Sequence, residues 1–178
     1  MSRTVGNSLM LVTLAVLLAG CGATQSVTDS TASATRSIFY KQVKTLHLDF
    51  RARSAINTDA RDMNAMSVPT LVRVYQLSES KALERASYDS LLGSDEQVLG
   101  GELLDTRALV IKPGEGAQLS VPLDKDARFV SVVALFRNPD TQMNTWRLIL
   151  TRDDLDPERA RIIELGDNRL TLRVLSRE

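Results

Sequence analysis

The side chains best suited to nucleophilic or metal chemistry are scarce in this sequence. Its 178 residues include one cysteine, Cys21, and one histidine, His47. A nucleophile needs a base within hydrogen-bonding reach, and a zinc site needs several Cys or His ligands. The chain has no Gly-x-Ser-x-Gly nucleophile elbow, and Gly114-Glu115-Gly116 is too short for a phosphate-binding loop. We therefore expect a protein that is not an enzyme, with no metal and no cofactor.

A run of carboxylates in the last third of the chain could instead suggest calcium binding. These residues are Asp153, Asp154, Asp156 and Glu158. An EF-hand loop also needs a glycine and a distal glutamate at fixed positions, which this stretch lacks. We interpret the carboxylates as solvated charges of a turn. Asp156-Pro157-Glu158 is also a good helix start, so the local structure stays open until Arg161, from which we expect a strand.

The lone cysteine has an informative setting. Leu18-Ala19-Gly20-Cys21 ends an apolar run that begins at Leu9, with Arg3 upstream. This is the layout of a secretory signal peptide, and the run is shorter than the roughly 20 residues that a membrane-spanning helix needs. The four residues resemble a bacterial lipobox, which implies cleavage between Gly20 and Cys21 and a lipid on the Cys21 sulfur. The alternative is an ordinary export signal with a chance cysteine.

The lipobox resemblance has consequences for location. Acyl chains on Cys21 and on the new amino terminus would tether the mature protein to a membrane, because two chains are enough for stable anchoring. Gly22 replaces the Asp that retains many lipoproteins at the inner membrane, so the resemblance favours the outer membrane. We expect residues 1–20 to be a signal peptide, residues 21–37 a lipidated, flexible tether of small polar residues, and residues 38–178 one folded domain.

Charge and cysteine content restrict the remaining possibilities. The chain has 22 basic and 22 acidic residues, so its charge does not suggest a nucleic-acid-binding surface. Once Cys21 is modified, no thiol remains for a disulfide. The hydrophobic core alone has to stabilise the exported domain.

Hydrophobic periodicity predicts a mainly β fold. Residues 45–52 alternate between polar and apolar, which places His47 on the outer face, and residues 68–77 form a β-branched central strand. A Pro-Gly turn at 112–115 follows a third strand, and Pro122 marks a strand at a sheet edge. Further strands are expected at 129–136, 146–150, 161–165 and 170–175. Seven or eight short strands predict an antiparallel sandwich.

Two irregular segments flank the second predicted strand. Residues 79–92 have helical spacing, with Ser87 able to cap a second helix and Gly93 expected to end it. Residues 55–67 form a loop longer than most hairpin connections. This loop contains Asn57, Asp59, Arg61, Met63 and Met66. Its methionines could be adaptable contacts for a partner or could fold back onto the domain.

Several segments, in the same order along the chain, resemble the TssJ family, the outer-membrane lipoproteins of the type VI secretion system. The resemblance begins with Cys21, a strand ending Val72-Arg73-Val74-Tyr75-Gln76-Leu77, and the helical stretch that follows it. The segments that carry it are Cys21, 72–77, 86–92, 109–115, 123–128, 132–139 and 146–147. No single segment is diagnostic, but the ordered set covers nearly the whole mature chain.

The resemblance implies a transthyretin-like β-sandwich with a small helical insertion. It also implies a structural role in the secretion membrane complex, facing the periplasm from the outer membrane. Members of the family use the loop between the first two strands to bind the periplasmic part of the inner-membrane protein TssM. Through TssM they are connected to TssL. That loop corresponds here to residues 57–67, so Asn57, Asp59, Arg61, Met63 and Met66 are the predicted partner-binding residues.

A different class of function stays open from the sequence. A periplasmic lipoprotein could bind a small molecule or peptide inside its sandwich. Such a site would need a sizeable apolar pocket with a few converging polar groups.

Overall fold

The computed structural model describes residues 43–59, 61 and 66–175. The signal peptide, Cys21 and the tether therefore lie outside the described residues and stay predictions. Within the described residues, no helix has the length and apolar character that crossing a membrane requires.

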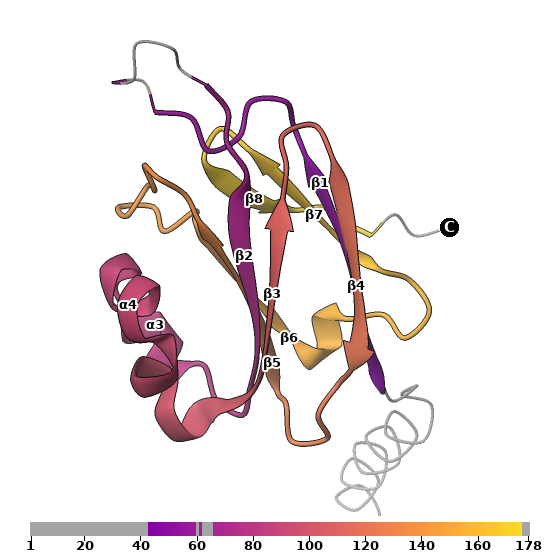
Figure 1. Cartoon of the computed structure of the whole chain (residues 1–178). Coiled ribbons are helices and arrows are strands. Elements are labelled where there is room, and N and C mark those ends of the chain that lie inside the picture. Colours follow the sequence, from indigo (N-terminus) through magenta and orange to yellow (C-terminus); the bar gives the residue numbers. More distant parts are fainter. Residues whose placement is uncertain (1–42, 60, 62–65, 176–178) are drawn as a thin grey trace, which may run out of the picture. The chain divides into compact units, whose positions relative to one another are not determined.

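The described chain folds into two four-stranded sheets (Figure 1). One sheet has the order β4-β1-β7-β8 and the other the order β3-β2-β5-β6. The strands are β1 (Thr45–Ala52), β2 (Thr70–Leu77), β3 (Leu103–Ile111), β4 (Gly116–Pro122), β5 (Phe129–Leu135), β6 (Arg147–Thr151), β7 (Arg161–Gly166) and β8 (Arg169–Leu172). This architecture confirms the predicted β-sandwich.

One pairing differs from the antiparallel sandwich that the sequence predicts. β1 pairs with β4 antiparallel but with β7 parallel, with Leu48 opposite Arg161 and Phe50 opposite Ile163. Parallel neighbours need a long crossover connection rather than a hairpin. Here the connection is the whole of the other sheet, together with β4, so strand periodicity alone could not reveal it.

The core lies between the two sheets. Leu46, Leu48 and Phe50 alternate along β1 and are almost completely buried, as the period-two pattern predicts. β5 is buried over Val130–Ala134 because helices cover its other face, which explains its nearly continuous apolar sequence. Burial of these side chains supplies the main stabilising free energy of a domain that has no disulfide.

Two turns determine how the strands connect. Gly114 has φ +73°, as the third position of a type II turn requires, and the Glu115 amide donates to the Lys112 carbonyl at 3.1 Å. This turn carries the chain from one sheet to the other. Asp167 and Asn168 have φ +52° and +56° and form the two-residue hairpin turn between β7 and β8. β4 is an edge strand, as Pro122 predicted.

The helical insertion is longer than predicted. Helix α3 spans Lys81–Arg85, and α4 spans Tyr88–Leu99 with its first turn capped by Ser87, whose Oγ accepts from the Ser90 amide at 3.2 Å. The sequence predicted a helix end at Gly93, and the helical backbone is interrupted directly after it, at Ser94 (φ −152°, ψ 53°). A second helical piece, which was not predicted, follows this kink, and Gly100, at φ +51°, ends α4 before the short helix η1 (Gly100–Glu102).

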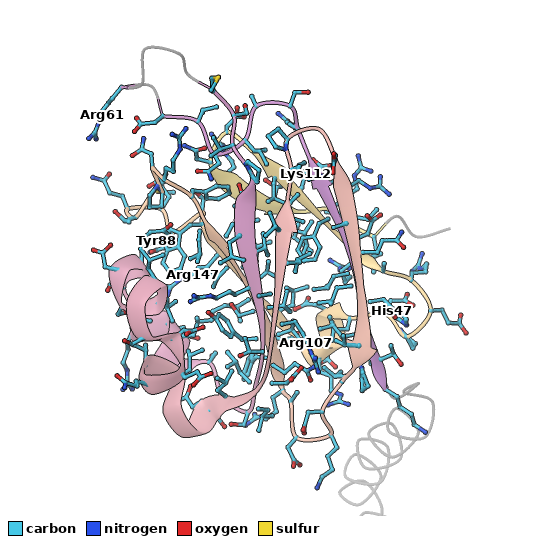
Figure 2. All side chains as sticks on the ribbon, viewed as in Figure 1. His47, Arg61, Tyr88, Arg107, Lys112 and Arg147 are labelled. Carbon is cyan, nitrogen blue, oxygen red and sulfur yellow. The ribbon has the colours of Figure 1, made fainter. Side chains whose placement is uncertain are left out.

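Polar side chains fasten this insertion to the outer face of the β3-β2-β5-β6 sheet (Figure 2). Arg147 donates to the carbonyls of Leu83, Glu84 and Ala86 at the end of α3. On β2, Arg73 donates to the Leu91 carbonyl at 2.7 Å, and Tyr75 donates to Asp95 at 2.8 Å. The two arginines thus supply donors to helix carbonyls, and Tyr75 adds a bond to a helix carboxylate.

Aromatic side chains complete the same contact. Tyr88 packs edge-on against Trp146, with 5.2 Å between ring centroids, and its hydroxyl donates to the Phe136 carbonyl at 2.5 Å. Burial raises the pKa of Tyr88 to about 12. Burial, and then the hydrogen bond to Asp95, also raise the pKa of Tyr75 well above its usual value. Both hydroxyls therefore stay protonated donors at any physiological pH.

The stretch that the sequence left open is a short helix followed by a turn. Helix η2 spans Arg152–Asp154, and the Asp154 carboxylate accepts from the Thr151 amide and hydroxyl at 2.7 Å. The Asp156 carboxylate accepts from the amides of Glu158 and Arg159. Both carboxylates thus organise turns, and the strand β7 begins at Arg161 as predicted.

Replacing Arg147 by Met should test the fastening of the helical insertion. Arg147→Met keeps an apolar stem but removes the guanidinium that donates to three helix carbonyls, so we expect the free energy of unfolding to fall by about 1–3 kcal/mol. Urea denaturation measures this change. Arg107→Met, which removes only a half-exposed pair with Asp105, is the matched control and should change stability by less than about 0.5 kcal/mol. Equal losses in both variants would contradict the assignment.

Candidate functional site

The connection between β1 and β2, residues 53–69, is the long loop that the sequence singled out. In Figure 1 its described residues, 53–59, 61 and 66–69, lie at one end of the sandwich, beside the β3–β4 turn and the β7–β8 turn. β1 leads into it from the opposite end, where the described chain begins. A strand of eight residues spans about 25 Å, so the loop lies at the far end of the domain from the chain's entry point.

A buried asparagine holds the base of this loop. Asn57 is 3% exposed and adopts a positive φ of +50°, which asparagine tolerates better than most residues. Its side chain donates to the Pro69 carbonyl at 3.2 Å and accepts from the Arg137 amide at 2.6 Å. Asn57 therefore joins the two ends of the loop and ties them to the start of the β5–β6 connection.

Arg137, which follows β5, reinforces the same junction. Its guanidinium donates to the Asn57 carbonyl at 3.1 and 3.3 Å and to the Met66 carbonyl at 3.0 Å. One cationic side chain thus satisfies backbone acceptors from both sides of the loop. Hydrogen bonds from charged groups are stronger than neutral ones, so this bridge fixes the loop's position firmly.

The β7–β8 turn supports the loop from the other sheet. The Asn168 side chain accepts from the Thr58 amide at 3.0 Å and donates to the Thr58 carbonyl at 2.7 Å. The side-chain amide thus pairs with both backbone groups of Thr58, as a residue of a neighbouring strand would. The Asp167 amide donates to the Ala55 carbonyl at 3.2 Å. The positive φ of the turn residues is what points these groups at the loop.

The predicted partner-binding residues occupy different environments. Arg61 is exposed, Met66 is 61% exposed, and Asp59 is half-buried with its carboxylate accepting from the Arg61 amide at 3.0 Å. Met63 lies outside the described residues. Asn57 was predicted to present its side chain to a partner, but it is buried with its side-chain amide hydrogen-bonded inside the domain. Its role in the structure is to position the loop.

Two of the residues that build this site were missed by sequence reasoning. Arg137 and Asn168 lie 80 and 110 positions from the loop residues they hold. The local sequence signals near them were turn residues: Asn138-Pro139 follows Arg137, and Asp167 precedes Asn168. Those signals predict turns, but they do not say which loop a turn will support.

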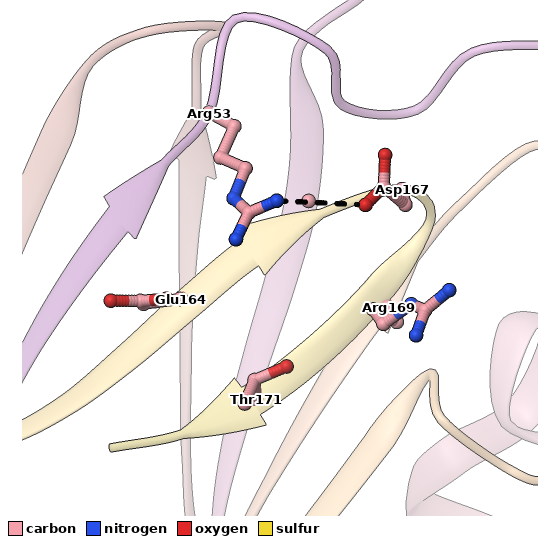
Figure 3. Close-up of a pocket in the computed structure, with 6 residues that line it drawn as sticks. Arg53, Glu164, Asp167, Arg169 and Thr171 are labelled. Carbon is pink, nitrogen blue, oxygen red and sulfur yellow. Dashed lines mark ion pairs between the residues drawn. The ribbon is translucent and has the colours of Figure 1, made fainter.

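The described histidine and a polar hollow beside β7 and β8 lack a hydrogen-bonded network like the one at the base of the β1–β2 loop. His47 lies on the outer face of β1, as predicted, 2.9 Å from the Ser120 hydroxyl. A hollow of about 160 Å³ beside β7 and β8 contains Arg53, Glu164, Asp167 and Arg169 (Figure 3), and its Arg53–Asp167 pair, at 3.7 Å, is mostly exposed. In the part of the chain that the structure describes, no three His, Cys, Asp or Glu residues are grouped to hold a metal.

The space between the sheets, where the ligand-binding alternative would need its pocket, is filled by packed side chains. Leu46, Leu48 and Phe50 from one sheet face Val72 and Val132 from the other, and all are at most 1% exposed. The filled core and the loop base held by Asn57 and Arg137 together define a domain of the β-sandwich class.

Comparisons with known proteins identify the family. A family model described as type VI secretion lipoprotein, with VasD, EvfM and TssJ among its members, matches residues 44–175. The chain belongs to this family of type VI secretion lipoproteins. The resemblance inferred from the sequence is thereby confirmed. A search of curated protein sequences gives no match.

Solved structures agree with this assignment. A chain in a structure described as the type VI membrane complex is 41% identical, with a TM-score of 0.70, and the match covers 75% of this chain and 100% of that one. A chain in a structure described as the TssM C-terminal domain from EAEC is 38% identical, with a TM-score of 0.68 and the same coverage. The lipoprotein TssJ1 from Pseudomonas aeruginosa is 25% identical, with a TM-score of 0.60, covering 75% of this chain and 98% of its own.

Replacing Asn57 should loosen the loop without unfolding the domain. Asn57→Ala removes both side-chain hydrogen bonds and leaves a poor residue for positive φ, so we expect a loss of about 1–3 kcal/mol and faster amide exchange in residues 55–59. Hydrogen exchange read by mass spectrometry measures this. Asn57→Asp, which keeps the acceptor for the Arg137 amide, should have a smaller effect, and Gln118→Ala on the exposed edge strand should have none. Unchanged exchange in Asn57→Ala would refute the clamp.

Proposed function

We propose that this chain is an outer-membrane lipoprotein that anchors the periplasmic part of TssM, and through it TssL, to the outer membrane. The observation that carries the proposal is the clamped loop at the end of the sandwich far from the chain's entry point. Family membership supports it, as do the matches to chains in structures described as the TssM C-terminal domain and the type VI membrane complex.

The proposed function assigns a separate task to each end of the chain. Lipid on Cys21 would hold the amino-terminal end at the membrane, with Gly20 and Cys21 as the cleavage site. Residues 22–37 are small and polar, and a chain of sixteen such residues has an end-to-end distance of roughly 20–24 Å. The domain could then stand away from the lipid and direct its loop into the periplasm.

The chemistry of the loop is suited to protein contact. Arg61 supplies an exposed guanidinium, and Met66 an exposed, unbranched apolar side chain that adapts to different surfaces. Arginine is enriched at interfaces because it combines charge with a planar apolar face. Holding the base of the loop rigid reduces the entropy lost on binding, which favours affinity.

The function that follows is mechanical linkage rather than catalysis. The family is one of structural secretion lipoproteins, and the described histidine and carboxylates serve strands and turns. Binding at one end and anchoring at the other would connect two membranes without any chemical step.

Binding to TssM should depend on the loop. The domain from Gly22 to Glu178 should capture the periplasmic segment of TssM from the same genome, whereas a variant with residues 58–67 replaced by a short Gly-Ser linker should not. The replacement keeps the core, Asn57 and Pro69 but alters the contacts of Thr58 with Asn168 and of Met66 with Arg137, so the melting temperature should fall by only a few degrees. Equal capture of the TssM segment by the intact domain and the loop replacement would contradict the proposed docking site. Failure of the intact, folded domain to bind would sink the proposed partner and favour the ligand-binding alternative.

Lipid attachment should depend on Cys21. Cys21→Ser removes the sulfur that accepts the lipid, so the folded protein should leave the outer-membrane fraction. Fractionation of cell envelopes followed by immunoblotting measures this. The Gly22→Ala variant, with the thiol intact, serves as a control and should stay with the membrane. Continued co-sedimentation of Cys21→Ser with the outer membrane would show that lipid is not the anchor.

A further inference from the structure

A second apolar surface lies below the β1–β2 loop, between helix α4 and the β5–β6 connection. It is a hollow of about 430 Å³ that is open to solvent. Leu92 and Tyr88 line it from α4, Leu135 and Phe136 from the end of β5, and Arg137 and Pro139 from the connection. Leu92 is 49% exposed, which leaves a large apolar side chain at its rim.

A row of apolar residues extends this hollow across the outer face of the sheet. Leu71 on β2 lies opposite Leu135 on β5 and opposite Val110 on β3. Directly opposed residues point to the same side of a sheet, and Arg73, two positions along β2, bonds to α4 on that side. The helices therefore cover the sheet next to Arg73 but leave Val110 60% exposed. We call Val110, Leu71, Leu135 and Leu92 the outer apolar patch.

The outer apolar patch is continuous with the loop through Arg137. Arg137 forms one wall of the hollow, and the same guanidinium donates to the carbonyls of Asn57 and Met66. Met66, which is 61% exposed, is therefore hydrogen-bonded through its carbonyl to Arg137, the residue that borders the hollow. A partner that contacts the lower part of the loop would lie within reach of the hollow.

We propose that the hollow receives a large apolar side chain of the same protein that binds the loop, the periplasmic part of TssM. This inference rests on the proposed function and adds a second contact to it. Interface energy concentrates where a large side chain enters a desolvated pocket surrounded by polar residues. Here Arg137 and Asp89 stand among the lining residues as such polar groups.

The shape and chemistry of the patch favour this occupant over two others. A lipid surface is contacted by protruding apolar groups, whereas this site is concave and lined in part by charged side chains. The chain's own residues 22–37 include Val27 as their only large apolar side chain. Ile38, Phe39 and Tyr40 precede the described domain by at most five residues, a reach of about 18 Å, whereas β1 alone spans about 25 Å from the chain's entry point to the loop. A protruding Leu, Phe or Trp side chain on a folded partner fits both the volume and the lining.

Replacing Leu92 tests the proposal. The full-length lipoprotein, purified in detergent, is titrated with the periplasmic segment of TssM in four forms: unchanged, Leu92→Glu, Leu104→Glu and the 58–67 loop replacement. A carboxylate at the rim of the hollow should weaken binding by about tenfold or more. Leu104 is a comparably apolar, 36% exposed residue at the other end of β3 from Val110, so its variant should bind like the unchanged protein.

The outcomes separate this proposal from the function on which it rests. If Leu92→Glu binds as tightly as the unchanged protein while the loop replacement does not bind, the hollow is not a contact and the proposed function stands. If the unchanged protein does not bind the TssM segment, the proposed function fails, and the hollow loses its assigned occupant with it. If Leu92→Glu instead converts a dimer into a monomer without weakening TssM binding, the patch is covered by a second copy of the chain, which also overturns the proposal.

Discussion

The junction between Asn57 and Arg137 is the interaction on which the functional end of this protein depends. The Asn57 side chain closes the β1–β2 loop by donating to the Pro69 carbonyl. The Arg137 guanidinium, just after β5, donates to the carbonyls of Asn57 and Met66. A long loop normally loses position because many backbone groups are satisfied only by water. Here a buried amide and one guanidinium replace that water. The two described ends of the loop are thereby held to both sheets.

The helical insertion contributes to the same end of the molecule. Tyr88 donates to the carbonyl of Phe136, the residue directly before Arg137, so α4 fixes the point from which the guanidinium reaches the loop. Arg147 and Arg73 in turn fasten the helices to the sheet. Loop, hollow and helices are therefore parts of one connected polar and aromatic network. A domain without disulfides achieves rigidity at its surface in this way, while the apolar core supplies its overall stability.

The packing of the sandwich indicates where this type VI secretion lipoprotein can offer contact surfaces. Buried residues alternate along β1, and β5 is buried on both faces, so side chains fill the described space between the sheets. Loops at the ends of a sandwich can vary without disturbing this packing.

The sequence by itself determined the local structure and much of the class. Alternation over 45–52, the Pro-Gly turn and Ser87 as a cap correctly predicted a strand, a turn and a helix start, because each depends on neighbours within a few residues. The parallel β1–β7 pairing, the second helical piece after Ser94 and the burial of Asn57 appear only in the tertiary structure. For Asn57 the partner is remote, because Arg137 lies 80 positions away. Periodicity indicates which face of an element is buried, but only the folded chain decides which distant side chain it meets.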